Sequence, residues 1–412
     1  MPGDKVLVID DDPDIRRVVE RRLRAAQYEV LTAGDGEAGL RLARAEHPRV
    51  VLLDLMMPRV HGFQVCQEIR NDPSLRSIKV IITSAKAYPV DIKKAKDVGA
   101  DEYLTKPYDL EEMVTKVQAL LDAAGAPVRV KFWGTRGSIP TPGPATQRYG
   151  GNTSCVEVRW GDNILLLDCG SGARELGLAL SREFKGRTLD AHIFVGHTHW
   201  DHIQGFPFFV PAYVPGTRLT LYSLRGADKS LEKVFTGQMD GSYFPVSLAD
   251  MMARLQFVEL EGEVAIGGAK VSHVYLNHPG LAIGFRIQLG PKSLVYLSDH
   301  EPYWRLSGDN EHNRKLEREV TEFARDADLC IREAQYTDEE YAVKRGWGHS
   351  TWSDALESAH EANVKVLALY HHDPMHDDDA MDRIVADCQA RMRDRGMTFL
   401  CFAASDNYQM TL

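Results

Sequence analysis

The sequence predicts an α/β protein with two domains, a doubly wound parallel sheet of five strands followed by a layered αββα sandwich. Three observations predict this architecture. The chain has 412 residues, more than a single hydrophobic core usually serves. Its first part alternates short apolar runs with amphipathic stretches, which is typical of a parallel sheet with helices on both faces. After residue 125 the pattern changes to strands separated by glycine-rich turns.

The elements of the first part alternate between strands and helices. The Gly-Ala-Pro at 125–127 ends this alternation and indicates a linker. We therefore expect a first domain over 1–122, a linker over 123–128 and a second domain over 129–412. The expected strands are VLVID (6–10), YEVLTA (28–33), VVLLDLM (50–56), VIITSA (80–85) and YLTKP (103–107), and expected helices include IRRVVERRLRAA (15–26) and LEEMVTKVQALLDAA (110–124).

The second part has longer strands and turns that contain glycine. Its apolar runs are bounded by Gly, Asp, Asn and His, which are typical of strand ends. The expected strands are VRVKFWG (128–134), SCVEVRW (154–160), NILLLDCG (163–170), HIFVG (192–196), LTLYSL (219–224), KSLVYLSD (292–299) and VKVLALYHH (364–372).

Composition and charge exclude several classes of protein. Hydrophobic residues make up 44% of the chain and charged residues 26%, and no apolar window is long enough for a membrane span. The formal net charge of −10 disfavours a nucleic-acid partner. The opening MPGDKVLVID lacks the segments of a signal peptide, so we expect a cytoplasmic protein. The cysteines lack CxxC spacing, and most of them are expected to be small buried residues: Cys66, Cys155, Cys169, Cys330, Cys388 and Cys401.

Charged side chains follow three expected strands of the first domain. Asp10 and Asp11 follow one strand, Asp54 a second and Lys106 a third. The carboxyl ends of parallel strands meet at one edge of a sheet. Clustered carboxylates suit Mg²⁺, and a carboxylate beside that ion can attack a phosphoryl donor. Each acid taken alone is also explained as a cap of a helix or turn.

The motifs VIDDDPD, LLDLMMPRVHGF, IITSAKA and YLTKP follow one another in the first domain. In this order they resemble the receiver domain of two-component response regulators. The resemblance implies that Asp54 accepts a phosphoryl group from a sensor histidine kinase, and it leaves a homodimer open. It also implies roles for Asp10 and Asp11 in holding Mg²⁺, for Ser84 and Lys106 in binding the phosphate, and for Tyr103 as an aromatic switch.

The run VGHTHWDHIQG places His197, His199, Asp201 and His202 directly after a strand. Three imidazoles and a carboxylate this close together are costly to bury unless they coordinate something. Residues 197 and 199 can face one metal while residues 201 and 202 face a second. Further candidates at strand ends are His278, Asp299 and His371, with His372 as the rival of His371.

This set resembles the HxHxDH motif of the metallo-β-lactamase superfamily. The resemblance implies two divalent metals bridged by Asp299. Imidazole and carboxylate ligands accommodate zinc, manganese and iron alike. One metal would bind His197, His199, His278 and Asp299, and the other would bind Asp201, His202, Asp299 and His371. Structural or supporting roles are expected for Asp168, His273 and His300.

Two later segments, REAQY (332–336) and GWGHSTWSDALESAHEANV (346–364), narrow the reaction. They resemble the glutamate-containing and GHST-type segments of ribonuclease Z and related phosphodiesterases, including the cyclic phosphodiesterase of phosphonate metabolism. The resemblance implies that Glu333 orients His349, which contacts the scissile phosphate or protonates the leaving oxygen. The alternatives are a surface position for Glu333 and a helix-capping role for His349, since a helix is expected to begin near residue 350 or 351.

The expected function is that of a response regulator whose output domain is a dinuclear-metal hydrolase. A small phosphodiester such as a cyclic nucleotide is the expected substrate, and phosphorylation of Asp54 is expected to control its hydrolysis. Asp201 is also expected to accept a hydrogen bond from the attacking water. Tyr243 and Phe244 are candidates for an aromatic wall beside a base or for ordinary core packing. Two alternative functions are a di-iron enzyme that reduces oxygen or nitric oxide, and a metal-binding signalling module without turnover.

Overall fold

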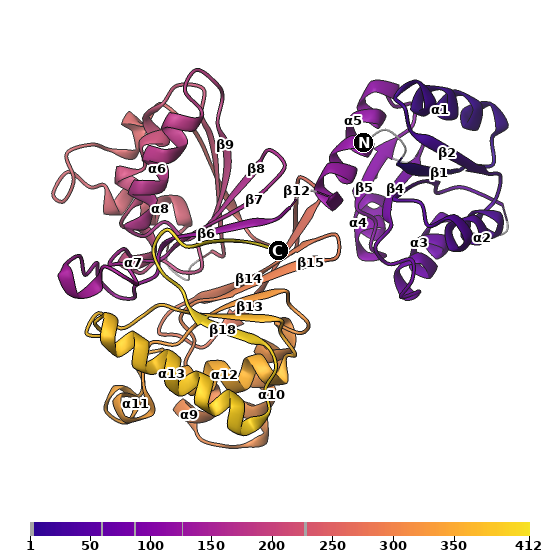
Figure 1. Cartoon of the computed structure of the whole chain (residues 1–412). Helices are drawn as coiled ribbons and strands as arrows, with labels where there is room; N and C mark the ends of the chain where they lie inside the picture. Colours follow the sequence, from indigo (N-terminus) through magenta and orange to yellow (C-terminus); the bar gives the residue numbers. More distant parts are fainter. Residues whose placement is uncertain (1–3, 59–60, 86–87, 126, 226–228) are drawn as a thin grey trace. The chain divides into compact units, whose positions relative to one another are not determined.

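The chain divides into two compact units, one formed by residues up to 125 and the other mainly by residues from 127 onward (Figure 1). The motifs LLDLMMPRVHGF and IITSAKA and the predicted linker over 123–128 each contain residues that the structure does not describe. The boundaries of the linker and of the two domains therefore stay a prediction. The computed structural model describes all residues except 1–3, 59–60, 86–87, 126 and 226–228.

The first unit is the predicted parallel sheet with helices on both faces. Its strands are β1 (Lys5–Ile9), β2 (Glu29–Ala33), β3 (Val50–Asp54), β4 (Lys79–Ser84) and β5 (Glu102–Thr105). Its helices are α1 (Pro13–Ala25), α2 (Gly36–Glu46), α3 (Gly62–Asn71), α4 (Pro89–Asp97) and α5 (Leu110–Gly125).

The strand order β2-β1-β3-β4-β5 brings the carboxyl ends of β1 and β3 to one edge. Ile9 pairs with Leu53, and Asp54 pairs with Thr83 of β4. Successive side chains of a strand point to opposite faces, so both faces of this sheet are apolar. Leu7 packs in the cluster that includes residues of α2, α3 and α4, and Val8 packs in the cluster that includes residues of α1 and α5.

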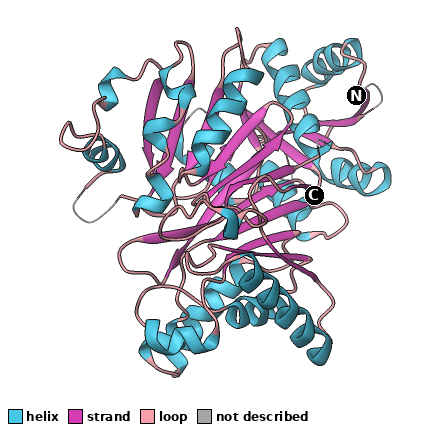
Figure 2. Ribbon diagram, turned by 60° about the vertical axis from the view of Figure 1, so that its left-hand side comes forward, coloured by secondary structure: helices cyan, strands magenta, loops and turns pink. Residues whose placement is uncertain are grey.

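The second unit consists of two seven-stranded sheets with helices on their outer faces (Figure 2). The first sheet contains β6 (Arg129–Gly134), β7 (Cys155–Trp160), β8 (Asn163–Leu167), β9 (Asp190–Phe194), β10 (Arg218–Ser223), β11 (Arg254–Glu259) and β19 (Gln409–Thr411). The second contains β12 (Val264–Ile266), β13 (Ala269–Leu276), β14 (Ala282–Leu289), β15 (Lys292–Leu297), β16 (Leu329–Glu333), β17 (Val366–Tyr370) and β18 (Leu400–Ala403).

Helices cover the outer face of each sheet through apolar side chains. Leu176 and Phe235 belong to helices that pack on the first sheet, and Leu356 and Ile384 belong to helices that pack on the second. The α-helices are α6 (Gly172–Glu183), α7 (Trp200–Ile203), α8 (Leu231–Gln238), α9 (Tyr303–Ser307), α10 (Glu311–Phe323), α11 (Asp338–Lys344), α12 (Trp352–Glu361) and α13 (Asp378–Arg395). Short 3₁₀ turns lie at Pro144–Thr146, Phe206–Phe208, Val210–Tyr213 and Leu248–Asp250.

Aromatic side chains fill the layer between the two sheets. The ring centroid of Phe194 on β9 lies 5.3 Å from that of Phe285 on β14. The centroid of Phe132 on β6 lies 6.1 Å from that of Tyr370 on β17. Because these pairs join strands of different sheets, they hold the sandwich together. The predicted αββα arrangement is confirmed.

The structure also bears on the expectations about the cysteines and about membrane-spanning segments. The six cysteines are free, and all but the half-buried Cys401 are buried, as predicted. Among the helices that the structure describes, none combines the length and the apolar character needed to cross a membrane.

The turn after β8 and the loop after β9 contact each other at Gly170 and Gly205. Gly205 donates its backbone N–H to Cys169 O at 2.9 Å, and Cys169 donates its own to His202 O at 2.8 Å. A Cβ atom on Gly205 would lie 1.8 Å from Gly170 O. This contact therefore leaves no room for a side chain at residue 205, and it locks the turn after β8 to the loop after β9.

We expect Gly205→Ala to destabilise the second unit by about 3 kcal/mol, because backbone atoms must separate to admit the methyl group. Gly237→Ala is the matched control: nothing lies within 4 Å of a Cβ at this helical position. It should stabilise the unit by about 0.5 kcal/mol. Urea unfolding followed by tryptophan fluorescence tests both variants, since all six tryptophans lie after residue 129. Equal urea midpoints of unfolding for the two variants would contradict the close packing of the two loops at Gly205.

Candidate metal centre and receiver site

The edge of the first sheet collects three acids and one lysine. Oxygen atoms of Asp10, Asp11 and Asp54 lie within 4.8 Å of one another, and such a set can hold Mg²⁺. Lys106 donates from Nζ to Asp10 Oδ2 at 2.7 Å and to Asp54 Oδ1 at 2.9 Å. Burial raises the pKa of Asp54, while the bond from Lys106 acts in the opposite direction. The edge therefore has the acids and the cation that phosphoryl transfer to a carboxylate requires.

The other two predicted receiver residues lie on β4 and β5. Ser84 is the last residue of β4 and is buried, and Tyr103 lies on β5, half-buried beside the apolar cluster under α4. Ser84 thus lies at the carboxyl end of its strand, whereas Tyr103 lies near the beginning of β5. Phosphorylation of Asp54 and the roles of Ser84 and Tyr103 stay predictions.

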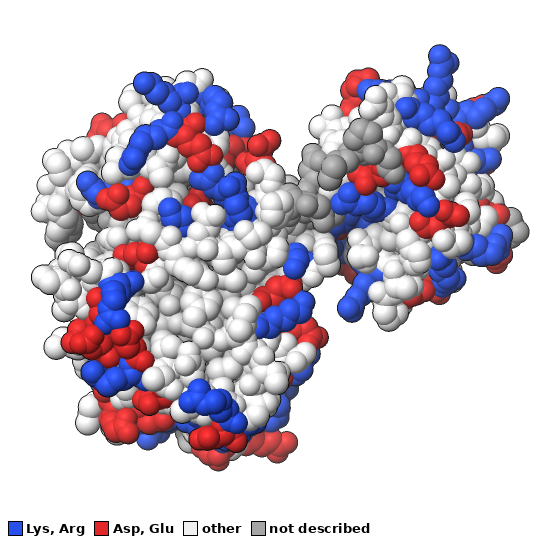
Figure 3. Space-filling model, viewed as in Figure 1, with Lys and Arg blue, Asp and Glu red and all other residues white. Residues whose placement is uncertain are grey.

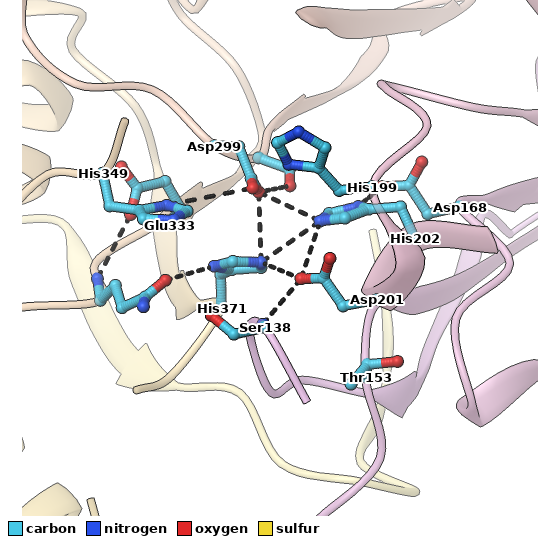
Figure 4. A network of polar contacts seen from close by, with 12 residues as sticks. Ser138, Thr153, Asp168, His199, Asp201, His202, Asp299, Glu333, His349 and His371 are labelled. Carbon is cyan, nitrogen blue, oxygen red and sulfur yellow. Dashed lines mark hydrogen bonds and ion pairs between the residues drawn. The ribbon is translucent and has the colours of Figure 1, made fainter. Parts of the chain in front are cut away.

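Four residues of the second unit form a compact polar cluster (Figure 4). His371 Nε2 lies 3.0 Å from Asp201 Oδ2, 3.2 Å from Asp299 Oδ1 and 3.2 Å from His202 Nε2. His202 Nε2 lies 3.3 Å from each of the same two carboxylate oxygens. Four atoms at these separations surround a point about 2 Å from each, which is the ligand distance of a tetrahedral divalent ion. The cluster therefore fits a metal.

A second set of nitrogen atoms lies on the other side of Asp299. His199 Nδ1 lies 3.1 Å from His278 Nε2, and both belong to a group with His197 whose ligand atoms lie within 4.8 Å of one another. His197 Nε2 lies 3.3 Å from Asp299 Oδ2, yet this buried nitrogen makes no hydrogen bond. A buried nitrogen without a hydrogen-bond partner is costly unless it binds an ion. The set therefore also fits a metal.

Several of these residues adopt backbone conformations that non-glycine residues rarely take. The φ angle is 49° at Asp299, 59° at His371, 60° at Asp168 and 64° at Ser138. Such left-handed conformations cost free energy and occur mainly where the surrounding structure imposes them. Asp168 and His371 directly follow the ends of β8 and β17, and Asp299 lies two residues after the end of β15. These strained turns aim the side chains at the centre.

Hydrogen bonds from neighbouring groups fix the orientation of the imidazoles. Asp168 Oδ2 lies 2.7 Å from His202 Nδ1, and its Oδ1 accepts a bond from Gly196 N at 2.7 Å. Gln335 Oε1 lies 2.9 Å from His371 Nδ1. In each case the outer ring nitrogen is occupied, so Nε2 is the nitrogen that faces the cluster. The supporting role expected for Asp168 agrees with this geometry.

The charges of the centre depend on one another. Burial alone would raise the pKa of Asp299 and lower the pKa of His202. The opposite charges outweigh burial. The protonated His371 and His202 hold the pKa of Asp299 well below its usual range, and the carboxylates of Asp201 and Asp299 raise the pKa of His202. Burial lowers the pKa of His278 to about 4, so this ring is neutral at pH 7. Metals bind neutral imidazoles and ionised carboxylates, and a bound divalent ion would take the place of the protons on the histidines.

Glu333 and His349 are both buried next to this centre, so a surface position for Glu333 is wrong. His349 Nδ1 lies 3.9 Å from Asp299 Oδ2 and, although buried, makes no hydrogen bond. Glu333 Oε1 accepts a bond from Ser350 N at 2.5 Å, so it holds the backbone beside His349. Thr351 caps α12, which rules out the capping role for His349. Burial raises the pKa of Glu333 to about 7.

The remaining candidates lie outside the two ligand sets. His372 Nε2 lies 2.8 Å from Ala404 O, which separates it from its neighbour His371 in the cluster. Burial lowers the pKa of His372 to about 3. His300 Nε2 bonds the carboxylate of Glu317 at 3.2 Å, and His273 is half-buried on β13. Phe244 packs on Phe208 at 5.3 Å between ring centroids, which favours core packing over an aromatic wall, and Tyr243 is 82% exposed.

A cavity of about 470 Å³ opens onto both ligand sets. It includes three residues that the sequence analysis did not single out, namely Ser138, Thr198 and Trp200. Ser138 N donates to Asp201 Oδ2 at 2.7 Å, and the Trp200 side chain is 79% exposed. The lining residues are Ser138, Thr198, His199, Trp200, Asp201, Asp299 and His349.

Comparison with curated proteins matches the first unit. Residues 6–118 match the family described as response regulator receiver domain. Protein PilG of Pseudomonas aeruginosa is 41% identical over 117 residues, which are 28% of this chain and 87% of PilG. The DNA-binding dual master transcriptional regulator RpaA of Synechocystis sp. is 45% identical over 117 residues, 28% of this chain and 48% of RpaA. The chain thus spans about half the length of the transcriptional regulators that it matches.

Comparison also matches the second unit. Residues 163–372, about half of the chain, match the family described as β-lactamase superfamily domain. Among solved structures, the metallo-β-lactamase fold protein YhfI from Bacillus subtilis is 18% identical, with a TM-score of 0.49, over 69% of this chain and 100% of YhfI. Chemotaxis protein CheY4 of Vibrio cholerae is 31% identical, with a TM-score of 0.28, over 28% of this chain and 97% of CheY4. The chain belongs to the β-lactamase superfamily, and in it a response regulator receiver domain precedes a unit of the metallo-β-lactamase fold.

Proposed function

We propose that the second unit is a dinuclear-metal phosphodiesterase and that phosphorylation of Asp54 controls it. The observation that carries this proposal is the position of Asp299. Its Oδ1 lies within 3.3 Å of His202 and His371, and its Oδ2 lies 3.3 Å from His197. A carboxylate with one oxygen in each of two ligand sets suits two ions held close together.

The proposed ligands form two sets, one for each ion. When bound, two divalent ions would lower the pKa of a water molecule and neutralise the charge of a phosphate. Zinc, manganese and iron all accept these donors. The proposed ligands of one ion are His197, His199, His278 and Asp299, and those of the other are Asp201, His202, Asp299 and His371.

Asp201 and His349 are proposed to act on the substrate and the attacking water. Ser138 N donates a hydrogen bond to one carboxylate oxygen of Asp201. Asp201 lines the cavity, where its carboxylate can accept a hydrogen bond from water. His349 lines the same cavity, on the opposite side of His371 from His202 (Figure 4). Burial holds the pKa of His349 well below its usual range, so we propose that this imidazole takes up a proton when an anionic phosphodiester enters the cavity and then donates it to the leaving oxygen. Glu333 fixes the backbone from which the imidazole projects.

The lining of the cavity supports a small diester that carries a ring. Among the described residues that line the cavity there is neither Lys nor Arg, so beyond the proposed ions a substrate with more charge than one phosphodiester would meet no cationic side chain there. The exposed indole of Trp200 offers a face on which a nucleobase can stack. On the face of the second unit shown in Figure 3, basic and acidic side chains are interspersed, which does not favour a long nucleic acid. A cyclic nucleotide is therefore the leading substrate class.

The proposed ligand sets predict the metal content of variants. We expect the wild-type protein to retain about two divalent ions per chain after dialysis. Asp299→Ala should lose most of both, because the bridging carboxylate is gone, whereas His371→Ala should lose mainly one. Atomic absorption measures the content, and His372→Ala is the matched control that should retain both ions. If Asp299→Ala still retained about two ions per chain, the proposed role of the Asp299 carboxylate as a ligand of both ions would be contradicted.

The proposed activity is tested with two diesters whose leaving groups differ. The metal-loaded protein should hydrolyse bis(p-nitrophenyl) phosphate and a cyclic nucleotide, and Asp201→Ala should hydrolyse neither appreciably. His349→Ala should lose about 10² to 10⁴ in kcat for the cyclic nucleotide, whose alkoxide must be protonated, and far less for the nitrophenyl ester. Absence of hydrolysis with a full metal complement would contradict the phosphodiesterase, and equal losses for both esters would contradict the acid role of His349.

The receiver site predicts regulation through Asp54. Beryllofluoride, which imitates a phosphoryl group on a carboxylate, should change the rate of diester hydrolysis or the oligomeric state of the wild-type protein. Asp54→Asn should show no such response, because it lacks the accepting oxygen. Stopped-flow hydrolysis and light scattering give the two readouts. Equal rates and equal mass with and without beryllofluoride would contradict the proposed control.

A further inference from the structure

Glu301 is a fully buried carboxylate that the sequence analysis did not single out. Its Oε1 accepts hydrogen bonds from Tyr341 Oη at 2.6 Å and from Gly346 N at 2.8 Å. Its Oε2 accepts a bond from Gly348 N at 2.9 Å. A buried carboxylate needs several donors to offset the loss of water. Glu301 obtains two of its three from the backbone directly before His349.

This backbone also touches the proposed metal centre. Gly348 O lies 2.8 Å from His278 Nδ1, so the outer nitrogen of that ring donates to the carbonyl. Gly348 has a φ of 90°, and a Cβ there would lie 2.2 Å from His278 Nδ1, which explains why only glycine allows the approach. The segment from residue 346 to residue 350 is thus held by Glu301 at one end and by Glu333, through Ser350 N, at the other.

We propose that Glu301 is a positioning residue for both His278 and His349. The orientation of a histidine ligand is set by the acceptor of its other ring nitrogen. For His278 that acceptor is Gly348 O, whose place depends on the bonds from Glu301 to the segment. The same bonds fix the residue next to His349, whose imidazole lines the cavity. The part concerning His349 rests on the proposed phosphodiesterase, whereas the part concerning His278 requires only metal binding.

Glu301→Gln is the variant that tests this role. A glutamine presents one oxygen and one NH₂ group, while the backbone N–H groups of Gly346 and Gly348 meet different oxygens of Glu301. Whichever way the amide is turned, one backbone N–H faces another donor, and the segment must shift. Tyr341→Phe is the matched control, since it removes the hydroxyl and leaves both backbone bonds in place.

The first readout is the affinity for Co²⁺ or Zn²⁺ in competition with a chromophoric chelator. We expect Glu301→Gln to bind one of the two ions about 10- to 100-fold more weakly, with an altered visible spectrum of the Co²⁺ form. Tyr341→Phe should stay within about threefold of the wild type. Gly348→Ala, which displaces the ring of His278 without changing a buried charge, should reproduce the weaker binding if Glu301→Gln proves too unstable to study. Wild-type affinity and spectrum in Glu301→Gln would overturn the proposal.

The second readout separates positioning from general loss of structure. Measured at saturating metal, Glu301→Gln should lower kcat for the cyclic nucleotide more than for bis(p-nitrophenyl) phosphate, and should add little loss in a His349→Ala background. Full additivity of the two substitutions would overturn the part of the proposal that concerns His349. If the wild-type protein binds two ions but hydrolyses no diester, the proposed function fails, and the metal affinities of Glu301→Gln and Tyr341→Phe still decide the role of Glu301 toward His278.

Discussion

The carboxylate of Asp299 lies fully buried among imidazoles that come from four separate parts of the second unit. Ionised acids and protonated histidines are each costly in such a place, and the geometry tolerates them only because they face one another. The strained turns at Asp299 and His371, and the closely packed glycines at residues 170 and 205, serve this one arrangement. The two sheets and their aromatic filling supply the rigid frame on which those turns are built.

The fold was predictable because most of its strands and helices can be identified from short stretches of sequence. Each strand of the first unit is a short apolar run. In the second unit, strands such as β8 and β17 end directly before Asp168 and His371, where apolar residues give way to polar ones. The stretch from β11 to β13 was not singled out, because its strands alternate apolar and polar residues less regularly and are only partly buried. Alternation of apolar and polar residues marks a half-buried strand only where it is sustained over several residues.

The proposed ligands were predictable for a different reason. His197, His199, Asp201 and His202 stand within a few positions of one another, and the others stand within two positions of the end of an apolar run. Glu301, Gln335 and Ser138 could not be found in this way, because each acts through a contact with a residue distant in the sequence. The alternatives left open at Glu333 were likewise decided by long-range contacts, since its partner Ser350 is 17 positions away.

The spacing of the ligand candidates along the chain has a consequence for biosynthesis. The first of them, His197, leaves the ribosome long before His371, and the loop after β9 alone offers both imidazole and carboxylate donors. A nascent chain that captured an ion there would hold it with an incomplete set, in a geometry that does not distinguish one transition metal from another. Because β17 must join the second sheet before His371 reaches the proposed centre, selection of a metal there would fall after translation of most of the domain, when the sandwich closes.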